Sequence, residues 1–73
     1  GMSACARCGA PVGPLGEALT KKLVNRGCER FYCLHCLAAQ FGVSEELLCE
    51  KARQFQSSGC ALFEGMEIGD KDT

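Results

Sequence analysis

Residues 5–9 (CARCG) and residues 33–36 (CLHC) are the two short stretches that decide how this chain folds. Each holds two cysteines separated by two residues, a spacing that lets both sulfur atoms reach one metal ion. Two such pairs supply four thiolates, which complete a tetrahedral shell and leave no position open to water or substrate. We therefore expect one structural zinc ion, held by Cys5, Cys8, Cys33 and Cys36.

The number of cysteines leaves other interpretations of these pairs open. The 73-residue chain contains seven cysteines, and in a secreted protein they would form a disulfide framework. The count is odd, however, and no basic and apolar leader precedes the first pair, so we expect a cytoplasmic, metal-binding protein. Iron uses the same four thiolates and is the alternative metal, and cysteines packed without metal are the remaining alternative. No apolar run is long enough to span a membrane.

The two cysteine pairs lead into different local structures. Gly9 permits the left-handed backbone of a tight knuckle after the first pair. The second pair runs into a helical pattern, which places Cys36 at a helix N-terminus, where backbone amides favour a thiolate. A knuckle followed by a helix-borne pair resembles the treble-clef zinc fingers over residues 5–41, and the resemblance implies a zinc-stabilised binding module. Treble clefs usually carry a β-hairpin between the pairs, whereas residues 15–26 have a helical pattern here.

The rest of the chain predicts a mainly α fold with short β segments near the knuckle. Leucines at positions 15, 19 and 23 indicate a helix over residues 15–26. Residues 34–41 contain good helix formers, and Ser44 is a typical N-cap for a helix that comes after them. The apolar segment 60–63 is expected to pack back on the core. We therefore predict one domain over residues 2–63, in which a helical hairpin follows the metal site, and a flexible acidic tail over residues 64–73.

Four further residues have side chains that can bind metal or react, namely one histidine and three cysteines. His35, the single histidine, is expected to face solvent between two ligands, and its alternative role is to replace one of them. Cys28, Cys49 and Cys60 are expected to behave as small buried hydrophobes. The alternative makes one of these three a redox-sensitive thiol or a replacement ligand, and Cys60 is the first candidate for that ligand.

Residues 37–48 (LAAQFGVSEELL) resemble the helix-turn-helix of DNA-binding proteins. The matching positions are Ala39, Gly42, Val43 and Leu48. Such a motif would present the start of its second helix, residues 44–46, to the major groove. Two of those three residues are glutamates, which repel phosphates, so we expect only a tight helical corner.

The formal net charge of −1 indicates no particular partner, but the charges are unevenly distributed. The first 43 residues carry five basic side chains against two acidic ones, and residues 44–73 carry three basic side chains against seven acidic ones. If nucleic acid binds, Phe31 and Tyr32 would stack on its bases. The basic contacts would then be Lys21, Lys22, Arg26 and Arg30.

These features favour a non-catalytic interaction or adaptor module. No catalytic constellation is recognisable, and a thiolate bound to zinc is a poor nucleophile. We expect a protein partner that binds an apolar or mixed surface, because so short a chain leaves apolar surface uncovered. The last helix and residues 60–63 are the expected interface. The alternatives are a nucleic-acid-binding zinc finger and a thiol redox or metal-sensing protein, and a homo-oligomer is compatible with each.

Overall fold

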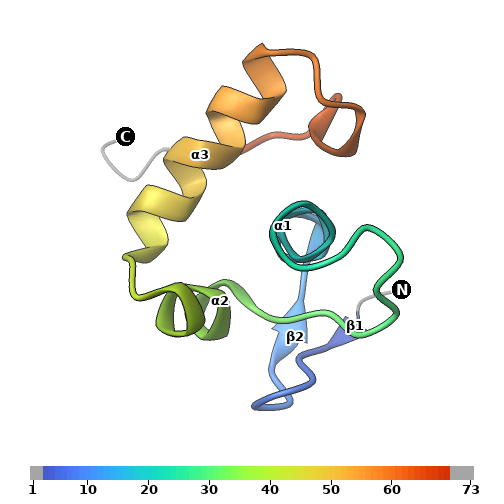
Figure 1. Ribbon diagram of the computed structural model, residues 1–73, viewed down its shortest axis with the longest axis vertical. Helices are drawn as coiled ribbons and strands as arrows, with labels where there is room; N and C mark the ends of the chain where they lie inside the picture. Colours follow the sequence, from blue (N-terminus) through green and yellow to red (C-terminus); the bar gives the residue numbers. More distant parts are fainter. Residues whose placement is uncertain (1–2, 70–73) are drawn as a thin grey trace.

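Three helices and a two-stranded sheet make up residues 3–69, the part of the chain that the computed structural model describes (Figure 1). The described chain measures 28 × 25 × 22 Å along its principal axes. No helix within residues 3–69 is long and apolar enough to cross a membrane. In chain order the elements are β1 (Ser3–Ala4), β2 (Pro11–Val12), α1 (Pro14–Leu23), α2 (Leu34–Phe41), α3 (Glu45–Ser57) and the short 3-10 helix η1 (Ala61–Phe63).

The sheet is a minimal antiparallel hairpin that encloses the first cysteine pair. Ser3 lies opposite Val12, and Ala4 lies opposite Pro11. The prediction of short β segments near the knuckle is therefore confirmed. The hairpin surrounds the first pair, and the segment between the two pairs is occupied by α1.

Helix α1 begins at Pro14, whose fixed φ suits the first helical position and whose missing N–H costs nothing there. The helix ends at Leu23, three residues before the predicted end at residue 26, so that part of the prediction was wrong. The side chain of Asn25 accepts a hydrogen bond from the Gly27 N–H at 2.8 Å, and this local turn competes with the helix. Arg26 consequently lies in a loop.

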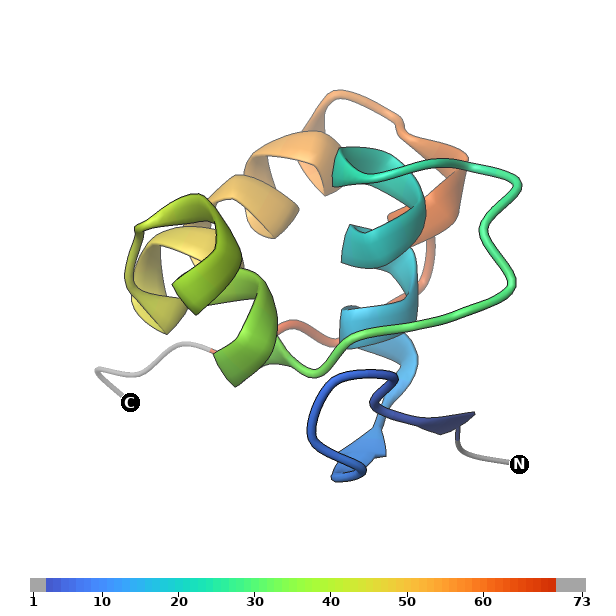
Figure 2. The ribbon, with the colours of Figure 1, turned by 60° about the horizontal axis from the view of Figure 1, so that its bottom comes forward.

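The connection over residues 24–33 returns from the end of α1 to the start of α2 and passes the hairpin on the way (Figure 2). Two hydrogen bonds fix its path. The Tyr32 N–H donates to the Thr20 hydroxyl at 3.1 Å, and the Ala6 N–H donates to the Phe31 carbonyl at 2.9 Å. The second cysteine pair is thereby carried to the first.

Gly16 permits the close approach of three segments at the start of α1. A Cβ atom at this position would lie 2.8 Å from the Val12 Cγ1 and 3.0 Å from the Tyr32 carbonyl oxygen. Real Cβ atoms essentially never come as close as the first of these distances. The missing side chain therefore lets β2 and the returning connection meet against the helix.

Helices α2 and α3 form the tight corner that the sequence predicts. Gly42 ends α2 in the left-handed conformation with φ of 67°, and Ser44 caps α3 by accepting a hydrogen bond from the Leu47 N–H at 3.0 Å. Of the positions matched to the helix-turn-helix, Leu48 is buried and Val43 is half-buried, whereas Ala39 is exposed and its neighbour Ala38 is buried.

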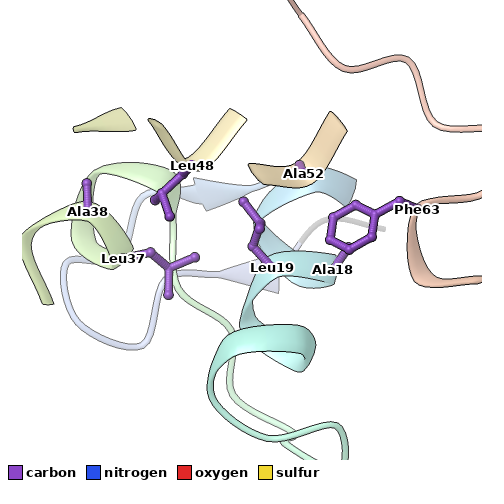
Figure 3. Packing of buried hydrophobic residues seen from close by; sticks show 7 residues of the cluster. All are labelled: Ala18, Leu19, Leu37, Ala38, Leu48, Ala52 and Phe63. Carbon is purple, nitrogen blue, oxygen red and sulfur yellow. The ribbon is translucent and has the colours of Figure 1, made fainter. Parts of the chain in front are cut away.

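The apolar core lies where the three helices and η1 meet (Figure 3). Leu19 and Phe63 are completely buried, and the Phe63 ring lies 5.6 Å from the Phe55 ring between centroids. The prediction that residues 60–63 pack back on the core is confirmed. The buried members of this cluster are Ala18, Leu19, Leu37, Ala38, Leu48, Ala52 and Phe63.

The chain beyond η1 continues along the core as far as it is described. Met66 and Ile68 pack against the core, and the Arg53 guanidinium donates a hydrogen bond to the Gly69 carbonyl at 2.9 Å. Residues 70–73, the end of the predicted acidic tail, lie outside the described residues. The flexibility of segment 64–73 stays a prediction, as does the domain boundary at residue 63.

Candidate metal centre

The first cysteine pair is held by a short knuckle between β1 and β2. The Cys5 N–H donates to the Ala10 carbonyl at 2.7 Å, and the Gly9 N–H donates to the Cys5 carbonyl at 2.9 Å. Gly9 has φ of 81°, a conformation that residues with a Cβ atom rarely adopt, so the glycine permits this turn. The Arg7 N–H points back to the Cys5 sulfur at 3.4 Å. This is the left-handed knuckle that Gly9 predicts.

The second pair lies at the N-terminus of α2. Cys33 is the N-cap residue, and its carbonyl accepts the Leu37 N–H at 2.9 Å. Cys36 lies in the first turn, where its side chain is buried. The first N–H groups of a helix have no partner within the helix, but burial and the neighbouring thiols outweigh them at Cys36, so the thiolate expected at this position needs a cation.

All four sulfur atoms of the two pairs lie within 4.8 Å of one another. Those of Cys8 and Cys33 lie 3.7 Å apart, although 25 positions separate the two residues in the sequence. Cys5 and Cys36 are buried, Cys33 is half-buried and Cys8 is exposed. The structure therefore brings together the four cysteines that the sequence singles out.

The spacing of these sulfur atoms fits a tetrahedral metal ion. With metal–sulfur bonds of about 2.3 Å, neighbouring sulfurs of a tetrahedron lie about 3.8 Å apart. The measured 3.7 Å between Cys8 and Cys33 is close to that edge. A disulfide needs about 2.05 Å, and none of the seven cysteines, all of which lie within residues 3–69, forms one. The cluster can hold a metal ion in a closed four-sulfur shell.

The pKa values of the two buried thiols in the cluster, Cys5 and Cys36, are shifted in opposite directions. Burial by itself raises the pKa of Cys5, but hydrogen bonds from the backbone of Cys33, Cys8 and Arg7 outweigh it and lower this pKa from 9.0 to about 6. Burial raises the pKa of Cys36 to about 12, and the neighbouring thiols of the cluster add to the rise. One thiolate is thus prepared by the protein alone, whereas a fully ionised cluster requires a cation.

His35 and Cys60, the two alternative ligands, lie outside the cluster. The His35 side chain is 80% exposed, as predicted, and its Nδ1 lies 3.4 Å from the Glu45 carboxylate. The Cys60 sulfur lies 3.7 Å from the Lys22 ammonium, which also lies 4.8 Å from the centre of the Phe55 ring. Cys60 therefore belongs to the α1–α3 side of the molecule.

Cys28 and Cys49 are half-buried and lie outside the four-cysteine cluster. The Cys28 thiol donates a hydrogen bond to the Arg30 carbonyl at 3.0 Å within the returning connection. Cys49 lies on α3 between Leu48, which is buried, and Glu50, which is exposed. Both thiols sit at the boundary of the core, as small hydrophobes do.

The basic residues named as nucleic-acid contacts are spread over several surroundings. The Lys21 ammonium lies 5.7 Å from the centre of the Phe31 ring, whereas Lys22 faces Phe55 on another part of the molecule. Arg26 and Arg30 are exposed in the connection between α1 and α2. Phe31, an expected stacking residue, thus already has a lysine ammonium of the same chain over its ring.

The sequence interpretation missed two features next to the metal centre. Thr20 is completely buried, and its hydroxyl joins α1 to the residue before Cys33. The sequence signal that could have revealed its burial was its position next to Leu19, on the inner face of the helix. The second feature is a groove bordered by Val24 and Phe41, and no periodic pattern marks it.

Comparisons of the chain with known protein families, with curated proteins and with solved structures found no match. The candidate metal centre therefore rests on its own geometry.

Proposed function

We propose that this chain is a structural-zinc module that binds a partner protein and carries out no catalysis. The observation that carries the proposal is the cluster of four cysteine sulfurs within 4.8 Å of one another. Four thiolates fill every position of a tetrahedral ion, so no site is left at which water or substrate could be activated. Zinc without an open position stabilises structure and supplies no chemistry.

Zinc is the preferred ion for this donor set. It is bound by thiolates in tetrahedral geometry without redox change, and a structural site of four cysteines is one of its common forms. Iron shares the same ligands and stays the alternative. The knuckle within a hairpin, together with a second pair on a helix N-terminus, supports the proposed treble-clef arrangement.

The ion would join two parts of the chain that the apolar core alone holds weakly. It would tie the hairpin to the start of α2, while the main core lies between the helices and η1. Zinc binding in small domains supplies apparent free energies of about 10–16 kcal/mol at neutral pH. That amount exceeds the marginal stability of a domain this small, so folding and metal binding are expected to occur together.

Metal analysis of the purified protein tests the metal part of this proposal. We expect one zinc per chain, together with a cobalt-substituted form whose spectrum shows tetrahedral thiolate coordination. Replacement of Cys5 or Cys36 by serine should abolish stoichiometric binding, whereas Cys49→Ser should retain it. Iron in the purified protein, or cooperative unfolding that is unchanged after chelation, would contradict structural zinc.

The protein-binding part of the proposal is supported by uncovered apolar surface. Val24 and Phe41 are 48% and 44% exposed, and they are the large hydrophobic side chains most exposed within residues 3–69. Large apolar side chains that gather at one place on the surface typically mark an interaction site. The test is a peptide or protein ligand that binds the zinc-loaded form and is released when the metal is removed.

A further inference from the structure

A groove next to the metal centre lies between the end of α1 and helix α2. It has a volume of about 400 Å³ and is lined mainly by apolar side chains. Leu23 and Val24 come from the end of α1, Leu37 and Phe41 from α2, and Tyr32 from the connection between them. Cys36, a cluster cysteine, also lines it. The groove is therefore built on the segments that the metal centre would hold in place.

The two borders of this groove are its most exposed apolar side chains. Val24 follows the last residue of α1, and Phe41 is the last residue of α2. Both lie far enough out to meet a ligand, while Leu37 behind them is buried. An apolar side chain that entered between Val24 and Phe41 would remove the exposed surfaces of both from water.

The single charged residue in the lining is Arg7, which stands between the ligands Cys5 and Cys8. No ion pair within residues 3–69 involves its guanidinium. The groove consequently combines an apolar floor with one cation at its metal-centre end, and the described part of the chain supplies no carboxylate for that cation. A ligand that complements the groove is apolar over most of its length and carries an anion at one end.

We propose that this groove binds a short acidic peptide segment of a partner protein, with one apolar side chain inserted between Val24 and Phe41 and a carboxylate against Arg7. This inference rests on the proposed function and adds the location and the chemistry of the partner. Arg7 is well suited to a carboxylate because its planar guanidinium can donate two parallel hydrogen bonds. The groove size suits one large side chain with its neighbours, as in the anchor pockets of peptide-binding domains.

Two other occupants fit the same observations less well. A second copy docked groove to groove would bring two Arg7 side chains to one interface whose lining contains no carboxylate. Nucleic acid would place phosphates near Arg7, but Lys21 and Lys22 pack on Phe31 and Phe55 and do not line the groove. Both occupants remain as outcomes that the experiment can detect.

The experiment is a selection of random 12-residue peptides (about three turns if helical) displayed on phage, carried out against the zinc-loaded full chain. Selected peptides are then synthesised, and their dissociation constants are measured. Four variants are compared with the wild type after zinc content and denaturation midpoint have shown that each is folded. Phe41→Gln and Arg7→Glu change the groove, whereas Ala39→Gln and Lys51→Glu are matched surface changes outside it.

The expected result is a consensus with one large apolar residue and at least one acidic residue. Its affinity should fall about tenfold or more in Phe41→Gln and in Arg7→Glu, as expected for central contacts, and stay unchanged in the two controls. A peptide in which the acidic residue is replaced by lysine should regain affinity for Arg7→Glu. This exchange of charges identifies the contact with Arg7 directly.

Other results overturn the inference in distinguishable ways. Peptides that bind with equal affinity to wild type and both groove variants would overturn the groove and leave the protein-binding function standing. Failure to enrich any peptide on folded, zinc-loaded protein would contradict both. A concentration-dependent dimer that Phe41→Gln abolishes, or nucleic-acid binding that Arg7→Glu abolishes, would assign the groove to the corresponding occupant and overturn the peptide.

Discussion

The hydroxyl of Thr20 accepts a hydrogen bond from the backbone N–H of Tyr32 at 3.1 Å and donates one to the Gly16 carbonyl at 2.7 Å. Thr20 is completely buried, and Tyr32 immediately precedes Cys33, a cysteine of the four-sulfur cluster. One side chain thus satisfies a backbone group of the returning connection and fixes that connection against α1. The position of the second cysteine pair depends on this contact.

Replacement of Thr20 by valine keeps the shape of the side chain but removes both hydrogen bonds. The Tyr32 N–H would lose its acceptor in a partly buried place, and such a loss costs about 1–3 kcal/mol. We expect the free energy of unfolding of the zinc-loaded protein to fall by that amount in urea denaturation. Thr20→Ser, which retains the hydroxyl, should lose less, and equal stability of Thr20→Val and wild type would contradict the role assigned to the bond.

Gly16→Ala tests the close approach of three segments at the start of α1. The new Cβ atom would lie 2.8 Å from the Val12 side chain and 3.0 Å from the Tyr32 carbonyl oxygen, so the hairpin and the connection must both move away from α1. Overpacking of this kind costs about 1–3 kcal/mol, despite the better helix propensity of alanine. The checks are the denaturation midpoint and the zinc affinity, and we expect both to fall.

The matched control is Gly27→Ala, because a Cβ atom there meets its nearest neighbour at 3.6 Å, an ordinary contact. This variant should keep the wild-type midpoint and zinc affinity. If Gly16→Ala proved as stable as Gly27→Ala, the hairpin and the connection would not approach α1 closely at Gly16.

The stability of the zinc-loaded protein should decrease as the pH falls from 9 towards 6. In the metal-bound state the four ligands carry no protons, whereas thiols of the unfolded chain take them up below their ordinary pKa of 9.0. The unfolded state then binds more protons, so acid favours it. In the metal-free protein, Cys5 has a folded pKa lowered to about 6, so the stability that its ionisation contributes there is present above pH 9 and is lost as the pH falls through 6.

Thermal denaturation in a zinc buffer over this pH range measures the effect. Cys49→Ser removes a thiol outside the cluster and should leave the pH dependence unchanged. In the metal-free protein the raised pKa of Cys36, about 12, acts in the opposite sense, and its contribution is lost as the pH rises from 9 towards 12. A zinc-loaded midpoint that is independent of pH between 9 and 6 would show that the cluster does not hold the ion.

The parts of the fold that the sequence predicts are those encoded by short-range patterns. Within each cysteine pair, the Cys-x-x-Cys loop lets both sulfurs reach one ion, and α2 ends at Gly42 because glycine adopts the left-handed cap. The Ser44 cap and the start of α3 follow from the same local rules. These features need no knowledge of the rest of the chain.

The features that the sequence does not predict depend on contacts between distant segments or on a single side chain. Helix α1 ends early because Asn25 forms its own turn, an effect that the leucine spacing cannot reveal. The burial of Thr20 and the groove between Val24 and Phe41 depend on the path of residues 24–33 past the hairpin. Periodicity identifies the inner face of each helix, but it does not identify which surface its neighbours leave uncovered.

Phe63→Ala tests whether η1 completes the core independently of the metal centre. Phe63 is completely buried against α1 and against the Phe55 ring, and loss of such a ring costs about 3–5 kcal/mol. We expect the denaturation midpoint of the zinc-loaded protein to fall accordingly. The folded variant should still bind one zinc, because Phe63 belongs to a different buried cluster from Cys5 and Cys36.

The control is Leu62→Ala, at a half-buried neighbouring position, which should lower the stability less. A Phe63→Ala variant that is as stable as Leu62→Ala would show that the core does not extend to η1, and a folded variant without zinc would show that core and metal centre are coupled.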